Sequence, residues 1–149
     1  MSRASPVDEA SYDVAAVFKP AQAGATILVV EDEVLVRLMI TDELRAQGYL
    51  VVEAANADEA LAVLRSTVAV DLLLTDVRMP GTHDGLDLAR LVRAAHPSVK
   101  VIIASGQMPD SVASVATDGF FAKPYDVERL VARINGLLVS GKANCARSS

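Results

Sequence analysis

Five polar residues in this sequence follow or end short apolar segments, and together they could do chemistry. They are Glu31 and Asp32 after TILVV (26–30), Asp76 at the end of VDLLLTD (70–76), Ser105 at the end of KVIIAS (100–105), and Lys123 after GFFA (119–122). Short apolar runs bounded by turn residues are typical of buried strands. The polar residues are therefore expected at strand ends, where the chain returns to solvent.

These residue types suit phosphoryl transfer. Carboxylates that lie close together repel one another unless a cation joins them, and carboxylate oxygens suit the hard cation Mg²⁺. Beside such an ion, Asp76 is placed to attack a phosphorus atom and form an acyl phosphate. The transition state needs positive charge and hydrogen-bond donors, which Lys123 and Ser105 would supply. Gly106 would leave the entrance to the site open.

The segments between the apolar runs have the pattern of helices. Helices are expected over 33–48, 57–66 and 84–96 and from Asp126 onward, with a further strand at 49–54. Leu35, Leu38, Met39 and Leu44 form an apolar stripe in the first of these, and Leu130, Ile134, Leu137 and Leu138 form one in the last. Asn56 and Glu59 have the spacing of a capping box.

Strand and helix alternate five times, which predicts an α/β fold with a parallel sheet and helices on both faces. Ligands of such sheets bind at the carboxyl ends of the strands. Four of the five predicted strands bring a charged or hydroxyl residue to that edge. We therefore expect the five polar residues to form one site.

Composition limits the class of protein. The chain has 149 residues, a net charge of −5 and a pI of about 4.9, without a basic stripe, so DNA binding by this chain is not expected. Its single cysteine, Cys145, excludes an internal disulfide and favours the cytoplasm. No apolar stretch reaches the roughly 18 residues of a membrane span, and no signal peptide is recognisable. We expect a flexible arm (1–24), one domain (25–140) and a polar tail (141–149).

The motifs LVVEDE, LLLTDVRMPG, VIIASG and FFAKPY resemble those of the response-regulator receiver domain, the phosphoacceptor of two-component signalling. The resemblance covers about residues 25–140 and implies a flavodoxin-like, doubly wound sheet of order 2-1-3-4-5. It also implies specific roles: Glu31 and Asp32 as Mg²⁺ ligands, Asp76 as phosphoacceptor and third carboxylate ligand, Arg78 as a ligand through its backbone carbonyl, Ser105 and Lys123 as contacts of the phosphoryl group, and Phe120, with Ser105, as the switch.

Two departures from the family pattern concern segment lengths. The loop from Asp76 to Gly85 is one residue longer than the common form. The segment from Ser105 to Lys123 is about four residues shorter, and its middle (108–118) is rich in serine. We therefore expect a shortened or irregular fourth helix, mobile until phosphorylation, which leaves the mode of dimerisation and partner binding open.

We expect a stand-alone regulator, a monomer or weak dimer, phosphorylated by a histidine kinase or histidine phosphotransfer protein and signalling through an unknown downstream protein. A phosphate sink and a non-phosphorylated binding module are the alternatives. An aspartate-nucleophile phosphatase would need a second acid where Arg78 stands. A flavin-binding protein would need aromatic side chains that this chain, without Trp, does not offer. At most, slow self-phosphorylation and self-dephosphorylation are expected as enzymatic activity.

Overall fold

The computed structural model describes residues 24–81, 83–106 and 115–148, with side chains described as far as residue 139. Its strands are β1 (Thr26–Val30), β2 (Leu50–Ala54), β3 (Leu72–Asp76), β4 (Lys100–Ser105) and β5 (Gly119–Ala122), and its helices are α2 (Val34–Ala46), α3 (Ala57–Leu64), α4 (Gly85–Ala95) and α5 (Val127–Ser148).

All strand pairs are parallel, and the sheet has the order β2-β1-β3-β4-β5. The predicted flavodoxin-like fold is therefore confirmed.

Most of the expected fourth helix falls on 107–114, outside the described residues, and 115–118 contain no helix. The predicted arm (1–24) also falls outside them, except for Gly24, whereas α5 includes residues 141–148 of the predicted tail.

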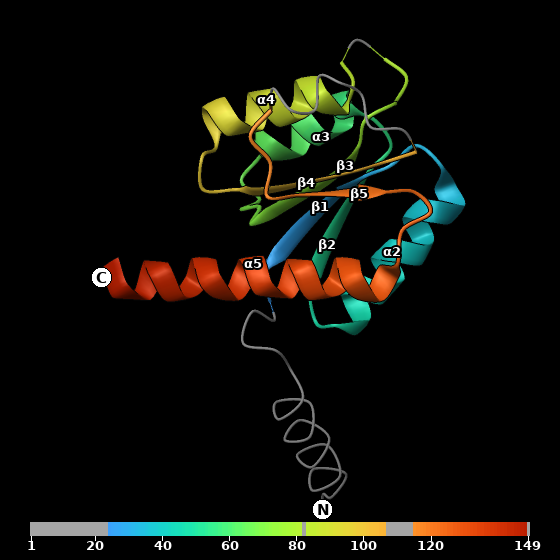
Figure 1. Cartoon of the computed structure of the whole chain (residues 1–149). Helices are drawn as coiled ribbons and strands as arrows, with labels where there is room; N and C mark the ends of the chain where they lie inside the picture. The colour runs from blue at the N-terminus through green and yellow to red at the C-terminus, as the bar shows by residue number, and fades with distance from the viewer. Residues whose placement is uncertain (1–23, 82, 107–114, 149) are drawn as a thin grey trace, which may run out of the picture.

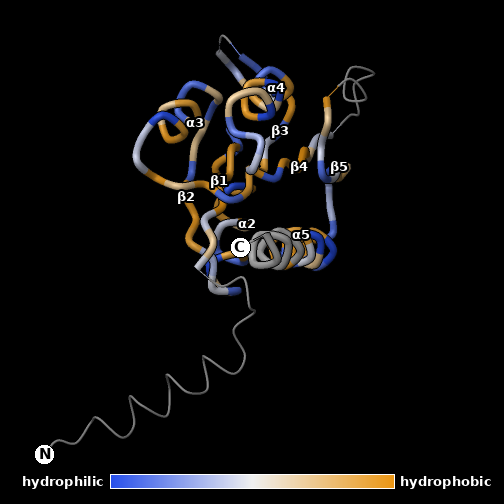
Figure 2. The backbone as a smooth tube through the Cα atoms, turned by 90° about the vertical axis from the view of Figure 1, so that its left-hand side faces the viewer, coloured by the Kyte–Doolittle hydropathy of each residue, from blue (hydrophilic) through white to orange (hydrophobic). Residues whose placement is uncertain are grey.

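Two helical layers enclose the sheet: α3 and α4 cover one face, and α2 and α5 cover the other (Figure 1). Successive strand residues point to opposite faces, so Leu28 and Leu73 join the core under α3 and α4, whereas Ile27 and Leu72 join the core over α2 and α5. Figure 2 shows the apolar strands between the two layers. Burial on both faces explains why these strands are continuous apolar runs.

Helix α2 buries a different face from the apolar stripe predicted from its sequence. Leu44 is buried, but Leu35, Leu38 and Met39 are exposed by 81%, 43% and 51%. The buried residues of α2 are Ile40, Thr41 and Leu44. The helix carries apolar residues around most of its circumference, so periodicity allowed two faces, and only packing against the sheet selected one of them.

Side-chain caps begin two of the helices as predicted. The Asn56 side chain accepts a hydrogen bond from the Glu59 amide (2.9 Å), although the Glu59 carboxylate returns to the amide of Ala55 rather than to that of Asn56. Asp126 accepts a hydrogen bond from the Glu128 amide at the start of α5 (2.9 Å). These contacts satisfy amides that the first helical turn leaves without partners.

Asp118 connects both helical layers to the start of β5. Its carboxylate forms an ion pair with Arg93 of α4 and accepts a hydrogen bond from the Val101 amide (2.8 Å). Its backbone carbonyl accepts two hydrogen bonds from Arg133 of α5 (3.0 and 2.6 Å). Both side chains of the Arg93–Asp118 pair are largely shielded, at 25% and 22% exposure. This network anchors the chain where it enters the last strand.

Replacing Arg93 by Met should lower the free energy of unfolding by about 1–3 kcal/mol, because a half-buried carboxylate loses its charged partner. Urea denaturation measures this change. The control is Arg129→Met, since Arg129 belongs to a highly exposed 3.9 Å ion pair with Asp126; it should change stability by less than about 0.5 kcal/mol. Equal effects of the two substitutions would contradict the anchoring role of Asp118.

Candidate functional site

Asp76 is the last residue of β3, an inner strand between β1 and β4, and it is 9% exposed. Its carboxylate accepts a long hydrogen bond from the Arg78 amide (3.4 Å). Its backbone carbonyl accepts one from the Thr75 hydroxyl (2.9 Å). The backbone of Gly85 lies directly against Asp76, so that α4 starts beside the end of β3. A Cβ atom on Gly85 would stand 1.7 Å from the Asp76 carbonyl oxygen.

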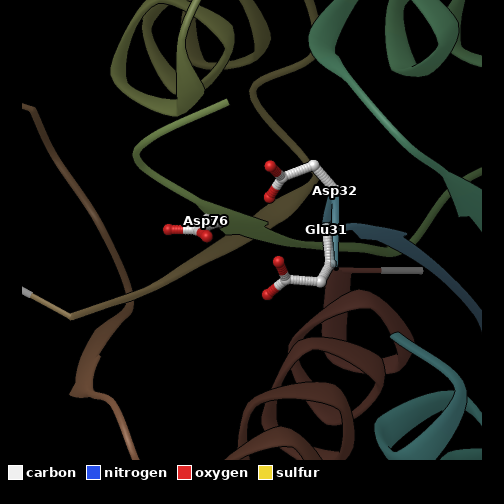
Figure 3. A group of neighbouring side chains, drawn as sticks. All are labelled: Glu31, Asp32 and Asp76. Carbon is white, nitrogen blue, oxygen red and sulfur yellow. The ribbon is translucent and has the colours of Figure 1, made fainter. Parts of the chain in front are cut away.

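Glu31 and Asp32 follow β1, the strand next to β3. Figure 3 shows their side chains and that of Asp76 at the same edge of the sheet. One carboxylate oxygen from each of the three residues lies within 4.8 Å of the others. Glu31 is buried (4% exposed), whereas Asp32 is exposed. The structure therefore brings the three acids from two strands close together, as predicted.

Lys123, which follows β5, reaches across to two of these acids. Its ammonium group forms an ion pair with the Glu31 carboxylate and lies 3.1 Å from Asp76 Oδ2. Its side chain is 16% exposed. The Lys123 amide also donates a hydrogen bond to the Ser105 carbonyl (2.8 Å), so the ends of β4 and β5 are joined at the site.

The environment shifts the pKa values of this ion pair. Burial raises the pKa of the Glu31 carboxyl, and hydrogen bonds from Lys123 and the Glu33 amide offset part of that rise. Burial alone would lower the pKa of Lys123, but the hydrogen bonds and negative charges of Glu31 and Asp76 outweigh it and raise the pKa. Lys123 therefore keeps its positive charge at neutral pH beside the carboxylates.

An open pocket of about 380 Å³ lies over these groups. Its lining residues are Asp32, Glu33, Asp76, Arg78, Ser105, Gly106 and Lys123. Asp32 and Asp76 thus face the space that a metal ion and a phosphoryl group would share, and the carboxylate oxygens are of the kind that hard divalent cations prefer. The chemistry and spacing of these acids fit Mg²⁺.

Like the buried Glu31, the predicted switch residue Phe120 does not line this pocket. It is partly buried against the core under α3 and α4, and it pairs with Ile103 of β4 in the sheet register. The neighbouring Phe121 packs on the opposite core.

Two residues that support the site were missed by sequence reasoning. Gly85 follows Asp84 in a dipeptide that reads as an ordinary helix start, and its close contact with Asp76 arises only in the fold. Arg37 reads as a polar position of a helix. In the structure it donates a hydrogen bond to the Glu31 carbonyl (2.6 Å). No sequence signal singles out Gly85, and the only signal for Arg37 is its place in the first turn after the acidic pair.

The comparison with protein families decides the identity of the fold. Residues 27–135 match the response regulator receiver domain. The chain belongs to the receiver-domain family. Receiver domains are the phosphoacceptor modules of two-component signalling, bind Mg²⁺ in their acidic pocket, and interact with histidine kinases or phosphotransfer proteins.

Curated relatives contain this receiver domain within longer chains. The sensor kinase CckA of Brucella abortus is 38% identical over 119 residues, which are 76% of this chain and 12% of the kinase. The phosphate regulon regulator PhoB of Pseudomonas aeruginosa is 36% identical over 121 residues, covering 77% of this chain and 52% of PhoB. The chain therefore spans about half the length of this transcriptional regulator and a much smaller part of the kinase.

Solved structures agree with the receiver fold. The response regulator TrrA from Thermotoga maritima, in complex with Mg²⁺-BeF, is 30% identical, with a TM-score of 0.69, and the match covers 76% of this chain and 98% of TrrA. A response regulator receiver protein from Pseudomonas putida has the same identity and coverage and a TM-score of 0.70.

Among the described residues, no helix has the length and apolarity needed to cross a membrane.

Replacing Gly85 by Ala should destabilise the receiver domain by about 3 kcal/mol or more, because the added Cβ would overlap the backbone of Asp76, which cannot rotate away. Chemical denaturation measures the loss. Gly136→Ala is the matched control: Gly136 lies in α5 with open space around its Cβ position, so the substitution should raise stability by up to about 1 kcal/mol. If Gly85→Ala were as stable as the wild type, the close contact between Gly85 and Asp76 would be contradicted.

Proposed function

We propose that the chain accepts a phosphoryl group on Asp76 from a phosphohistidine of a histidine kinase or a histidine phosphotransfer protein. The observation that carries this proposal is the setting of Asp76. Its carboxylate lies at an inner strand end, in an open pocket, beside two further acids and the Lys123 ammonium group. Few other chemistries need a buried aspartate to face both a cation site and a lysine.

In the proposed reaction, an oxygen of the Asp76 carboxylate attacks the phosphorus atom. The P–N bond to the donor imidazole breaks as the acyl phosphate P–O bond forms, and the imidazole leaves with the electron pair. Mg²⁺, held by Glu31, Asp32, Asp76 and the Arg78 carbonyl, would neutralise charge on the phosphoryl oxygens. Lys123 adds a second positive charge, and Ser105 supplies a hydroxyl from the end of the neighbouring strand β4.

The response to phosphorylation is proposed to pass through Ser105 and Phe120. Ser105 pairs with Ala122 of β5, and Phe120 lies two residues before Ala122 on the same strand. A shift of the Ser105 hydroxyl toward the phosphoryl group would therefore change the environment of the strand that carries Phe120. The downstream protein would read this change.

A protein donor is favoured over a small phosphate ester. Helix α2 starts directly after Glu33, which lines the pocket, and it exposes Val34, Leu35, Leu38 and Met39. Exposed apolar patches of this kind mark protein contacts. The acidic metal site and lysine speak against a non-phosphorylated binding module, and Arg78 stands where a phosphatase needs its second acid. A phosphate sink uses the same chemistry and differs only in having no downstream reader.

Replacing Asp76 by Asn should abolish phosphorylation, because an amide is not a nucleophile toward phosphorus. The chain is incubated with labelled phosphorylated histidine kinases of the source organism and with acetyl phosphate, and hydroxylamine-sensitive label is counted. The fold should remain, since the amide has the shape of the carboxylate and relieves charge repulsion. Asp42→Asn, at an exposed position on α2, should label like wild type. Labelling of Asp76→Asn at the wild-type level would exclude Asp76 as the acceptor.

Mg²⁺ should raise the melting temperature of the wild type, because an ion that binds only the folded state stabilises it by mass action. Asp32→Ala should lose most of this shift, whereas Asp42→Ala should keep it. Differential scanning fluorimetry over a MgCl₂ series, with a matched series of NaCl for ionic strength, makes the comparison. If all three proteins respond equally, the acids do not form the metal site.

A further inference from the structure

The turn that carries Glu31 and Asp32 lacks the usual support of a helix start. Glu33 is the N-cap residue of α2 and forms no side-chain cap hydrogen bond. The Glu31 carboxylate accepts a hydrogen bond from the Glu33 amide (3.1 Å) but is also engaged by Lys123. The same carboxylate is needed for a metal ion. Some other group must therefore fix the backbone from which the two carboxylates project.

Arg37 is placed to do this. From the first turn of α2, its Nη1 donates to the Glu31 carbonyl oxygen (2.6 Å) and its Nε donates to Glu53 Oε1 on β2 (3.1 Å). The Arg37 side chain is 16% exposed. On the other side, the Glu31 amide donates to the Ala54 carbonyl, also of β2 (3.0 Å). Both polar groups of the Glu31 backbone are thus tied, directly or through Arg37, to the edge strand.

We propose that Arg37 is a positioning residue for the metal site: it holds the Glu31–Asp32 turn against β2, so that both carboxylates stay where Mg²⁺ and Asp76 need them. This inference rests on the proposed function. The planar guanidinium group presents its donors in a rigid fork, so one bond to Glu53 and one to the Glu31 carbonyl set the orientation of the turn.

The role is geometric rather than electrostatic. Glu53 pairs with the Arg37 charge, and a second arginine, Arg45, pairs with the other oxygen of Glu53 (3.2 Å). A positive charge close to the site would by itself repel Mg²⁺, so removing it could only strengthen binding on electrostatic grounds. Loss of Mg²⁺ affinity on removal of Arg37 would therefore report lost positioning.

Arg45 also provides a matched control. It contacts Glu53 and the Val51 carbonyl (3.1 Å), is 45% exposed, and makes no described contact with the Glu31–Asp32 turn. Arg45→Met and Arg37→Met therefore remove the same side chain from the same carboxylate. Only the second removes a hydrogen bond to the turn.

The experiment titrates ¹⁵N-labelled full chain with MgCl₂ at fixed ionic strength and follows amide chemical shifts, while urea denaturation records stability separately. Arg37→Met should weaken Mg²⁺ binding about tenfold, as loss of groups that orient metal ligands typically does. Arg37→Lys keeps the positive charge but not the planar set of guanidinium donors. It should therefore show most of the same loss of Mg²⁺ affinity. Arg45→Met should bind within about twofold of wild type.

The outcomes separate the two claims. If Arg37→Met folds and binds Mg²⁺ as tightly as Arg45→Met does, the positioning role is overturned and the proposed function stands. A purely structural role would lower stability without changing the dissociation constant of the folded protein. If Arg37→Met fails to fold, Arg37→Lys and Glu53→Gln provide the comparison, and wild-type affinity in both overturns the inference. Absence of Mg²⁺ binding by the wild type overturns the proposed function together with the inference.

Discussion

Repulsion among three carboxylates is the physical constraint on which the site depends. Two like charges about 5 Å apart repel by roughly 3 kcal/mol at an effective dielectric constant of about 20, and by less where water screens them, as it does at exposed Asp32. Glu31 and Asp76 are largely buried and therefore poorly screened. Lys123 counters this repulsion by contacting both of them. The same arrangement leaves Asp32 and Asp76 facing the pocket, as the proposed Mg²⁺ site requires.

Because the carboxylates repel one another, the backbone that carries them must be fixed by contacts with neighbouring segments. Asp76 is held because β3 is an inner strand with neighbours on both sides, and because Gly85 lets α4 approach its backbone. The Glu31–Asp32 turn has only one strand beyond it, the edge strand β2. This is why the contacts of Arg37 with Glu31 and Glu53 matter more there than a single polar contact would in the middle of the sheet.

The surroundings of the site divide into a firmly attached part and an exposed part. The start of β5 is anchored through Asp118 to both helical layers, and its end is joined to Ser105 through the Lys123 amide. Phe120 lies between these two points. On the other side of the pocket, α2 exposes apolar side chains that its packing against the sheet does not use. Under the proposed function, the accessible surface of α2 would serve contact with the phosphoryl donor, and the fixed position of β5 would serve the response at Phe120.

Most of the fold could be predicted from sequence, because it depends on local and periodic properties. Short apolar runs bounded by turn residues, and caps such as Asn56 and Asp126, located the described strands and helices to within one or two residues, except for the C-terminal end of α5, which extends into the predicted tail. The meeting of Glu31, Asp32, Asp76, Ser105 and Lys123 also followed, since parallel strands deliver their carboxyl ends to one edge and that geometry needs no further detail. The expectation for 107–114 lies outside the described residues and remains a prediction.

What the sequence could not determine depends on contacts between segments distant in the chain. The buried face of α2 was decided by the sheet, because a helix that is apolar on most sides has no single periodic stripe to bury. The need for glycine at position 85 arises from its approach to Asp76, and the importance of Arg37 from its contact with Glu53, sixteen positions away. The sequence determined which residues could do chemistry and at which edge. Only the tertiary structure decided which residues fix the positions of these side chains, because those residues come into contact with the site only when distant segments of the chain pack together.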